Sequence, residues 1–179
     1  MMEWIMEMDS RILLFFQDAV RSPGLTPVFT VITTLGNGAV IWILISMGLL
    51  LFKKTKKTAL MCAAAMLVSL VINNFVLKNV VGRTRPYEVV QGLIPLIGKP
   101  RDYSFPSGHT ASSFAAAWVL FWRLPKRFGI PALLLAGLIG VSRLYVGVHY
   151  PTDVLVGMIS GIGCGWIACA LVSACLKEA

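Results

Sequence analysis

The sequence FPSGHTASSF, residues 105–114, stands where a polar segment gives way to an apolar one. Pro106 and Ser107 suit the start of a helix, because serine caps helix N-termini and proline is tolerated in the first turn. Gly108 lets a ligand approach the backbone closely, and His109 places a titratable ring in the first turn. Free N–H groups at a helix N-terminus favour an anion. Taken alone, the stretch fits an anion site, although a simple capped helix is the commoner case.

The composition is that of an integral membrane protein. Of the 179 residues, 57% are hydrophobic and only 13% are charged, and the mean hydropathy is +0.79, far from that of an ordinary soluble domain. Several apolar runs are long enough to cross a bilayer. The net charge of +8 therefore relates first to membrane topology and to anionic partners. No basic stripe with interleaved aromatic residues is present, so we expect no nucleic-acid binding.

The cysteines give no sign of a metal site. All of them lie in apolar segments, and none has a histidine at metal-ligand spacing, so we interpret them as small packing residues. They are Cys62, Cys164, Cys169 and Cys175. We expect the protein to need neither a metal ion nor another cofactor.

The N-terminal residues 1–20 place apolar side chains at roughly helical spacing among several charged ones. The run is too short and too charged to span a bilayer, so we expect an amphipathic helix in the membrane interface, ended by a turn at 22–24. Acidic residues stand where a cleavable signal would be basic, and we expect no such signal. The chain is thus predicted to form a single domain, 1–179, with the interfacial helix and turn in 1–24 and a helical bundle in 25–176.

Apolar segments predict an all-α membrane bundle of about five to six transmembrane helices. The five predicted spans lie within 28–52, 58–77, 107–124, 131–148 and 152–176. Residues 36–38, Gly-Asn-Gly, predict a break or a tight packing point in the first span. Gly157, Gly161 and Gly165 recur at four-residue intervals, which is typical of a face that packs closely against another helix. Asn73 and Asn74 are expected to hydrogen-bond to neighbouring helices.

The alternation of five spans assigns the loops to two sides of the membrane. One side receives the polar segment 78–104, and the other receives the lysine-rich loop 53–57, the link 123–127 and Lys177. The 16 lysines and arginines divide equally between the sides, so the positive-inside rule gives a tie. Because the lysines of 53–57 have no catalytic explanation, we place that loop in the cytoplasm and the polar segment outside the cell membrane.

The same alternation gathers the chemically active residues at one membrane surface. They are Lys78, Arg83, Arg85, Ser107, His109, Arg143, His149 and Asp153. A charged side chain at the centre of a spanning helix costs about 2.5–3.5 kcal/mol, so Arg143 is expected to face a polar interior. Several cations that converge with both histidines of the chain favour an anion site over arginines that merely reach the interface.

A phosphate ester would find what it needs among these residues. Cationic side chains can hold its oxygens and neutralise developing charge, and the two imidazoles can supply a nucleophile and a proton donor. Asp153 follows His149 by four residues. Pro151 argues against one continuous helix, but the carboxylate can still reach the imidazole from the first turn of the next helix. Such a carboxylate would fix the tautomer of the ring and stabilise its charged form.

Three motifs in this region resemble the signature of the type-2 phosphatidic acid phosphatase superfamily, which also includes vanadium haloperoxidases. The first, Lys, six residues, then Arg-Pro, is matched by residues 78–86. The second, Pro-Ser-Gly-His, is matched by 106–109, and the third, Ser-Arg, five residues, His, three residues, Asp, by 142–153. With the spans between them, the motifs cover about residues 58–175. The resemblance implies an all-α membrane bundle, which in many bacterial members has six spans.

The resemblance also implies roles for the motif residues in a metal-independent hydrolase. The reaction would pass through a phosphohistidine on His149, with Asp153 orienting that ring and His109 protonating the leaving group. The phosphoryl group would be bound by Lys78, Arg85, Ser107, Gly108 and Arg143.

The leading interpretation is a multi-pass membrane lipid phosphatase that acts at the outer leaflet on a phospholipid or prenyl diphosphate. We favour undecaprenyl diphosphate because the polar segment carries surplus cations. Lys99 and Arg101 could steer a second phosphate, although a solvated loop is the commoner case for such residues. Phosphatidate and phosphatidylglycerophosphate are the alternatives, because the motifs address the phosphate and not the lipid chain. A haloperoxidase-like oxidase fits the hydrophobic composition and short length less well. A non-enzymatic binder of anionic lipids would need the cations but not His149 paired with Asp153. The sequence does not indicate an oligomeric state.

Overall fold

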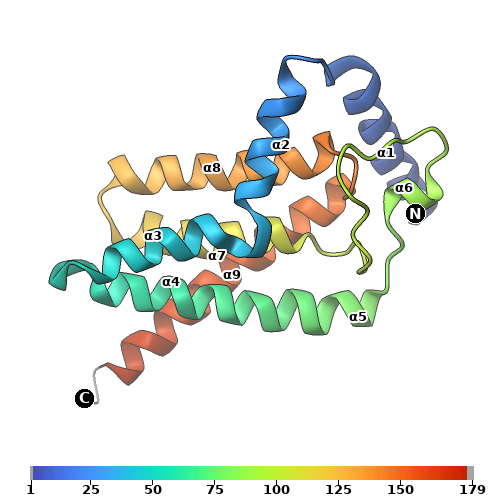
Figure 1. The fold of residues 1–179 in the computed structure, drawn as a ribbon. Helices are drawn as coiled ribbons and strands as arrows, with labels where there is room; N and C mark the ends of the chain where they lie inside the picture. Colours follow the sequence, from blue (N-terminus) through green and yellow to red (C-terminus); the bar gives the residue numbers. More distant parts are fainter. Residues whose placement is uncertain (1, 177–179) are drawn as a thin grey trace.

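Helices make up most of residues 2–176, the part of the chain that the computed structural model describes (Figure 1). They are α1 Met2–Phe15, α2 Leu25–Leu35, α3 Val40–Leu50, α4 Lys56–Ser69, α5 Lys78–Val81, α6 Pro86–Val89, α7 Gly108–Arg123, α8 Lys126–Tyr145 and α9 Pro151–Cys175. Within this range no strand occurs, which confirms the predicted all-α class. Lys177 lies outside the described residues.

A π-helical segment joins α4 to α5. Residues Leu70–Leu77 continue α4 in this wider geometry and lead directly into Lys78, the first residue of α5. Gly82 then ends the helix in the left-handed conformation (φ 60°), which glycine adopts without steric cost, and its N–H donates to the Lys78 carbonyl. The long helix thus brings Lys78 to its far end, whereas the sequence placed this residue in a polar segment.

Helix α7 is the centre of the bundle and packs against α4, α8 and α9 (Figure 1). Its contact with α9 is close, because a Cβ atom on Gly161 would lie 2.4 Å from the Ala111 carbonyl oxygen. A Cβ on Gly157 would lie 2.8 Å from the Ser107 carbonyl oxygen, and one on Gly165 3.0 Å from that of Ala115. The predicted glycine packing face of the last span is therefore confirmed, and its partner is α7.

Helices α2 and α3 form one bent pair. Their axes differ by 56° at the break, where Gly38 and Ala39 both have positive φ angles. This confirms the break predicted at residues 36–38. The ring of His109 lies against the bend, since a Cβ on Gly36 would come within 2.9 Å of its Cδ2 atom. Glycine at this position lets α2 and α3 approach the start of α7.

Within the described residues, three helices are long and apolar enough to cross a membrane, or four if the bent pair counts as one span. All five segments predicted to span are helical, but α7 has only 16 residues and is largely buried. The predicted start of the fourth span at residue 131 is wrong, because α8 begins at Lys126. Pro131 lies inside this helix, where proline removes one hydrogen bond without ending the helix.

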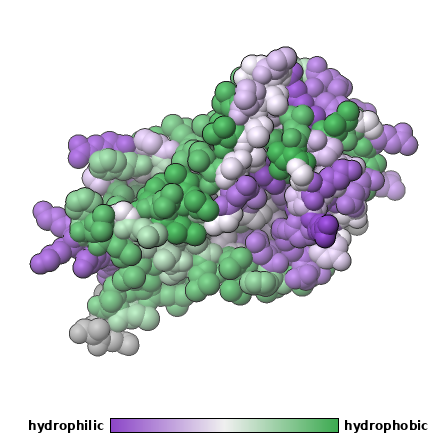
Figure 2. All heavy atoms as spheres, in the orientation of Figure 1, coloured by the Kyte–Doolittle hydropathy of each residue, from purple (hydrophilic) through white to green (hydrophobic). Residues whose placement is uncertain are grey.

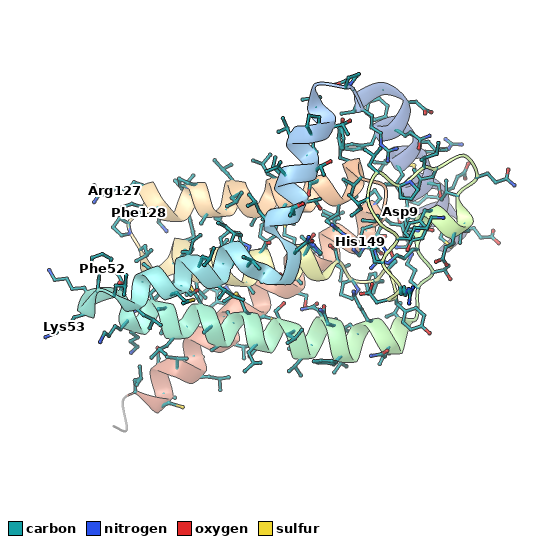
Figure 3. The ribbon with its side chains drawn as sticks, in the orientation of Figure 1. Asp9, Phe52, Lys53, Arg127, Phe128 and His149 are labelled. Carbon is teal, nitrogen blue, oxygen red and sulfur yellow. The ribbon has the colours of Figure 1, made fainter. Side chains whose placement is uncertain are left out.

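The surface has an apolar band between two polar ends (Figure 2). Lys53 and Arg127 lie at one end and His149 lies at the other (Figure 3). Helix α1 lies at the His149 end, where it exposes Trp4 and Phe15 and buries Leu13 and Asp9. The basic loops and the histidine therefore lie at opposite ends of the bundle, as the alternation of spans predicts.

The α7–α9 contact gives a stability prediction. Gly161→Ala should lower the free energy of unfolding by about 1–3 kcal/mol, the usual cost of overpacking, because its methyl group would meet the Ala111 backbone. Gly163→Ala is the matched control on the same helix, since its Cβ would have no neighbour within 4 Å. Thermal unfolding in detergent should show a lower Tm for the first variant only. Equal Tm values for the two variants would contradict the close packing.

Candidate active site

Segments far apart in the sequence meet at the α1 end of the bundle. The end of the long α4–α5 helix supplies Lys78, the start of α7 supplies His109, and the end of α8 supplies Arg143. A short turn after α8 carries His149. The backbone N–H of Ser107 donates to the Asp153 carbonyl at 3.0 Å, which joins the start of α7 directly to the start of α9.

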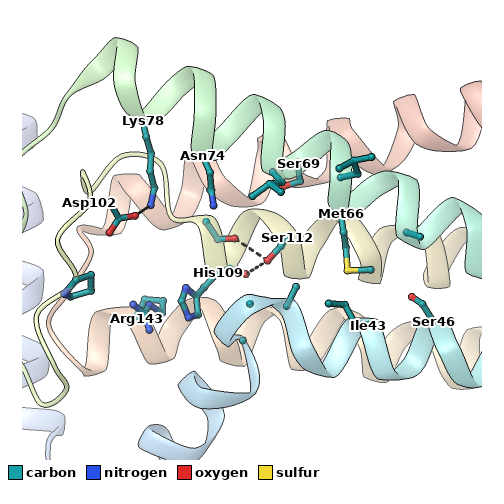
Figure 4. A pocket seen from close by; sticks show the side chains of 18 of the residues that line it. Ile43, Ser46, Met66, Ser69, Asn74, Lys78, Asp102, His109, Ser112 and Arg143 are labelled. Atoms are coloured by element: carbon teal, nitrogen blue, oxygen red, sulfur yellow. Dashed lines mark hydrogen bonds and ion pairs between the residues drawn. The ribbon is translucent and has the colours of Figure 1, made fainter.

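A cavity of about 710 Å³ opens between these elements (Figure 4). Its polar end is lined by Asn74, Lys78, Arg85, Asp102, Gly108, His109, Arg143 and His149. It continues along α3 and α4 between apolar side chains, among them Ile43, Met47, Leu50, Leu60 and Met66. The cavity thus joins a cationic, histidine-bearing end to an apolar channel within one space.

His149 is buried beside a cation and a carboxylate. Its Nε2 atom lies 3.3 Å from Nη1 of Arg85, which can only donate, so Nε2 accepts and the ring proton belongs on Nδ1. Nδ1 lies 3.5 Å from Oδ2 of Asp153, longer than an ordinary hydrogen bond. Catalytic hydrogen bonds of this kind often shorten only when substrate binds. The tautomer leaves the Nε2 lone pair directed toward Arg85 at the cavity.

The surroundings of His149 also keep the ring neutral. Burial lowers the pKa of His149 to about 3, helped by the charges of Arg85 and Arg143 and opposed by Asp153. The imidazole is therefore uncharged across the neutral range. A neutral ring that carries its lone pair on Nε2 is the form that a nucleophile requires, and in this structure that lone pair accepts from Arg85.

Asp153 is fully buried in the first turn of α9. Its Oδ2 accepts from the Tyr150 N–H at 2.9 Å and from the Ser104 hydroxyl, and its Oδ1 accepts from Nη1 of Arg83 at 2.8 Å. These bonds hold the carboxylate beside the His149 ring. The sequence expectation that the carboxylate reaches this ring from a new helix agrees with the geometry, because Pro151 begins α9.

His109 lies on the opposite side of the cavity mouth from Lys78 (Figure 4). Its Nε2 is 2.8 Å from Oδ1 of Asn37, the residue at the bend between α2 and α3. The carboxamide oxygen accepts the ring proton in the assigned orientation of the amide. Asn37 therefore fixes the direction of the imidazole. Its place in a Gly-Asn-Gly break within an apolar run was the signal available in the sequence.

The three cations differ in their partners. Arg143 is 2% exposed and donates through Nη1 to the Thr33 hydroxyl at 2.6 Å, while its Nε has no partner among the described residues. Lys78 and Arg85 both form ion pairs with Asp102, which the sequence reasoning missed. Burial alone would raise the pKa of the Asp102 carboxyl, but its hydrogen bonds and ion pairs with Lys78 and Arg85 lower it to about 2. The Asp102 carboxylate therefore stays ionised and paired with Lys78 and Arg85, two of the cations that are expected to bind phosphate.

Ser107 and Gly108 occupy different environments although they are adjacent. The Ser107 hydroxyl is buried and accepts from the N–H and hydroxyl of Thr110, so it caps α7 and does not line the cavity. Gly108 does line it, and a Cβ there would lie 2.6 Å from Oδ1 of Asn74. Eight residues received roles from the family resemblance. Of these, Ser107 and Asp153 do not line the cavity, and the other six do.

The comparisons with known proteins agree on the family. The sequence pattern of the PAP2 superfamily matches residues 58–177. The undecaprenyl-diphosphatase of Sulfolobus acidocaldarius is 36% identical over 128 residues, which cover 72% of this chain and 60% of that protein. This cationic, two-histidine site in a helical bundle is therefore that of a PAP2 protein, and the chain belongs to the PAP2 superfamily.

Solved structures show the same fold. The crystal structure of Aquifex aeolicus LpxE superimposes with a TM-score of 0.79 at 32% identity, covering 88% of this chain and 92% of that one. The PAP2-type phosphatidylglycerolphosphate phosphatase from Bacillus subtilis, a transmembrane protein, gives a TM-score of 0.74 at 29% identity, with 97% of this chain and 87% of that chain covered. The family resemblance stated from the three motifs is confirmed.

The environment of His149 gives a titration prediction. In a His109→Gln variant, His149 is the only histidine, and ¹⁵N NMR in detergent should follow its ring alone. The ring should stay neutral, with the proton on Nδ1, from pH 8 down to pH 5, because a group with a pKa of about 3 is protonated only in more acidic solution. Titration near the ordinary value of about 6.5 would contradict the buried, cation-rich site.

Proposed function

We propose that this protein is an integral-membrane lipid phosphatase. The observation that carries the proposal is the single cavity that runs from Arg143 and the two histidines to the apolar side chains of α3 and α4. A phosphorylated head group fits its cationic end, and a hydrocarbon chain fits its apolar end. A substrate with only one of these parts would leave half of the cavity unused.

The geometry supports a two-step reaction. In the first step the Nε2 lone pair of His149 attacks phosphorus and a P–N bond forms. The bond from phosphorus to the leaving oxygen breaks, which is the lipid oxygen of a monophosphate or the bridging oxygen of a diphosphate. His109 enters this step with a proton on both ring nitrogens, and it gives the Nδ1 proton to that leaving oxygen while Nε2 stays bonded to Asn37. In the second step His109 takes a proton from water, the water oxygen attacks the phosphohistidine, and phosphate leaves as the P–N bond breaks. Asp153 holds the His149 ring and balances the charge that it acquires.

The phosphoryl oxygens would be bound by Lys78, Arg85, Arg143 and the N–H of Gly108. Ser107 would contribute by capping the helix that presents this N–H. Three cations around the phosphate supply the charge stabilisation for which other phosphatases use metal ions. Asp102 must share or release Lys78 and Arg85 when phosphate enters, because its carboxylate forms ion pairs with both of them.

Undecaprenyl diphosphate is the proposed substrate. Lys99 and Arg101 are exposed cations in the loop that supplies Pro100 and Asp102 to the cavity, and they would suit a second phosphate. The relative from Sulfolobus acidocaldarius is named for this reaction. Phosphatidylglycerophosphate is the alternative, favoured by the Bacillus subtilis phosphatase, whose structure aligns with 97% of this chain. Phosphatidate shares the same head-group chemistry.

The proposal places the protein in the cell membrane as one domain, residues 1–179, with the site at the extracytoplasmic face. The lysines of 53–57 lie at the opposite end from His149 (Figure 3), and their charge favours the cytoplasm for that end. Helix α1 would lie in the interface, where its exposed Trp4 is suited to the head-group region. The bilayer and its lipids are the partners that this arrangement requires.

A panel of lipids tests the substrate class. The purified protein should release phosphate from undecaprenyl diphosphate faster than from phosphatidylglycerophosphate, phosphatidate or a lipid A phosphate in matched detergent micelles. EDTA should leave the rate nearly unchanged, because the cations and not a metal neutralise the phosphate. If phosphate were released faster from one of the other lipids, that lipid and not undecaprenyl diphosphate would be the preferred substrate. A strict requirement for Mg²⁺, or halide oxidation with vanadate and peroxide without phosphate release, would contradict the mechanism.

A further inference from the structure

Asp9 is a buried acidic residue on helix α1. The other acidic residues of this helix include Glu7, which is exposed and pairs with Arg11 on the same helix face. Asp9 is only 2% exposed and turns into the bundle toward the start of α9. A buried carboxylate is costly unless its oxygens are bonded, so its partners indicate its role.

One set of partners belongs to the N-terminus of α9. The N-cap residue of α9 is Tyr150, which is not one of the usual capping residues, and within the helix the side chain of Asp153 accepts from the Tyr150 N–H. Oδ1 of Asp9 accepts from the N–H of Thr152 at 3.0 Å, and Oδ2 accepts from the Thr152 hydroxyl. Asp9 therefore caps α9 from another helix, with its negative charge at the positive end of the helix dipole. The residue that follows Thr152 is Asp153.

The other partner is Arg83, whose guanidinium group links two carboxylates. Nη2 of Arg83 donates to Oδ2 of Asp9 at 2.7 Å, and Nη1 donates to Oδ1 of Asp153 at 2.8 Å. The same Nη1 donates to the Thr152 hydroxyl, and the guanidinium carbon lies 3.8 Å from the centre of the Tyr150 ring. The planar fork of arginine can hold two carboxylates in fixed directions, which lysine cannot do.

The charges of this group matter for His149. Asp9, Arg83 and Asp153 together carry one net negative charge, which faces an imidazole already surrounded by Arg85 and Arg143. Without Asp9 the charge of Arg83 would be balanced by Asp153 alone, and the carboxylate would stabilise a positive His149 ring less well. Resting on the lipid phosphatase function proposed above, we propose that Asp9 and Arg83 are positioning residues, which make the N-terminal helix part of the active site by holding Asp153 against His149.

The first test compares Asp9→Asn with Glu7→Gln on the lipid that the wild-type protein hydrolyses fastest. Asp9→Asn keeps an acceptor for the Thr152 N–H but removes the charge. It should lower kcat by about 10- to 100-fold, the range typical when a group that orients an active-site ligand is lost. KM should change less than about twofold, because Asp9 does not line the cavity. Glu7→Gln should keep wild-type kcat and KM.

Arg83→Lys is the second variant, since it keeps the charge but not the fork. It should lower kcat in the same way, and Asp9→Asn should cost little more in the Arg83→Lys background, because the two residues act through one link. If Asp9 only capped α9, the losses in kcat of the two single variants would instead multiply in the double variant. Multiplying effects, or an Asp9→Asn variant with wild-type kcat, would overturn the proposal.

A third measurement does not depend on turnover. In the His109→Gln background, Asp9→Asn should move the two ¹⁵N shifts of the His149 ring toward each other, because a loosened Asp153 would leave the selection of the Nδ1–H tautomer to Arg85 alone. Unchanged shifts would overturn the positioning role even if the wild-type protein hydrolysed none of the lipids. A protein without phosphatase activity but with the expected shift would refute the proposed function and leave the Asp9–Asp153 link standing.

Discussion

The close contact between α7 and α9 is the constraint on which the site depends. At Gly157 and Gly161 the backbones of the two helices approach so closely that no side chain fits between them. The Ser107 N–H can therefore donate to the Asp153 carbonyl, and the starts of both helices lie at one end of the bundle. That contact brings His109, from α7, and Asp153, from α9, to the end of the bundle where His149 lies. A bulkier residue at these positions would move His109 away from Asp153, and with it the proposed proton donor from the proposed orienting carboxylate.

The second constraint is electrostatic. Lys78, Arg85 and Arg143 are buried in a largely apolar bundle, where unpaired charges are costly. Asp102 offsets two of them through its ion pairs, and in the proposed reaction a phosphate group takes the same place. Asp153 is kept apart from these cations by its own partners, Arg83, Ser104 and the Tyr150 N–H. Asp102 thus occupies the place proposed for the phosphate, and Asp153 lies beside the His149 ring.

The sequence predicted most of the fold, because apolar periodicity, glycine spacing and the Gly-Asn-Gly break each have a local physical cause. It also predicted which motif residues would gather. It missed Asp102, because a carboxylate in a polar loop has no periodic pattern that reveals its partners. It placed the start of the fourth span at residue 131, five residues after α8 begins at Lys126. Asp9 resembled the other acids of α1, and only the packing of that helix against α9 distinguishes it.

The most direct test of the account is to trap the covalent intermediate. Substrate carrying ³²P in the terminal phosphate would be mixed with the His109→Gln variant, in which release of the intermediate should be slow, and quenched in alkali to preserve phosphohistidine. Peptide mapping should find the label on His149, and a His149→Ala variant should bind the lipid but carry no label. Turnover that persists in His149→Ala would contradict the assignment of His149 as the nucleophile.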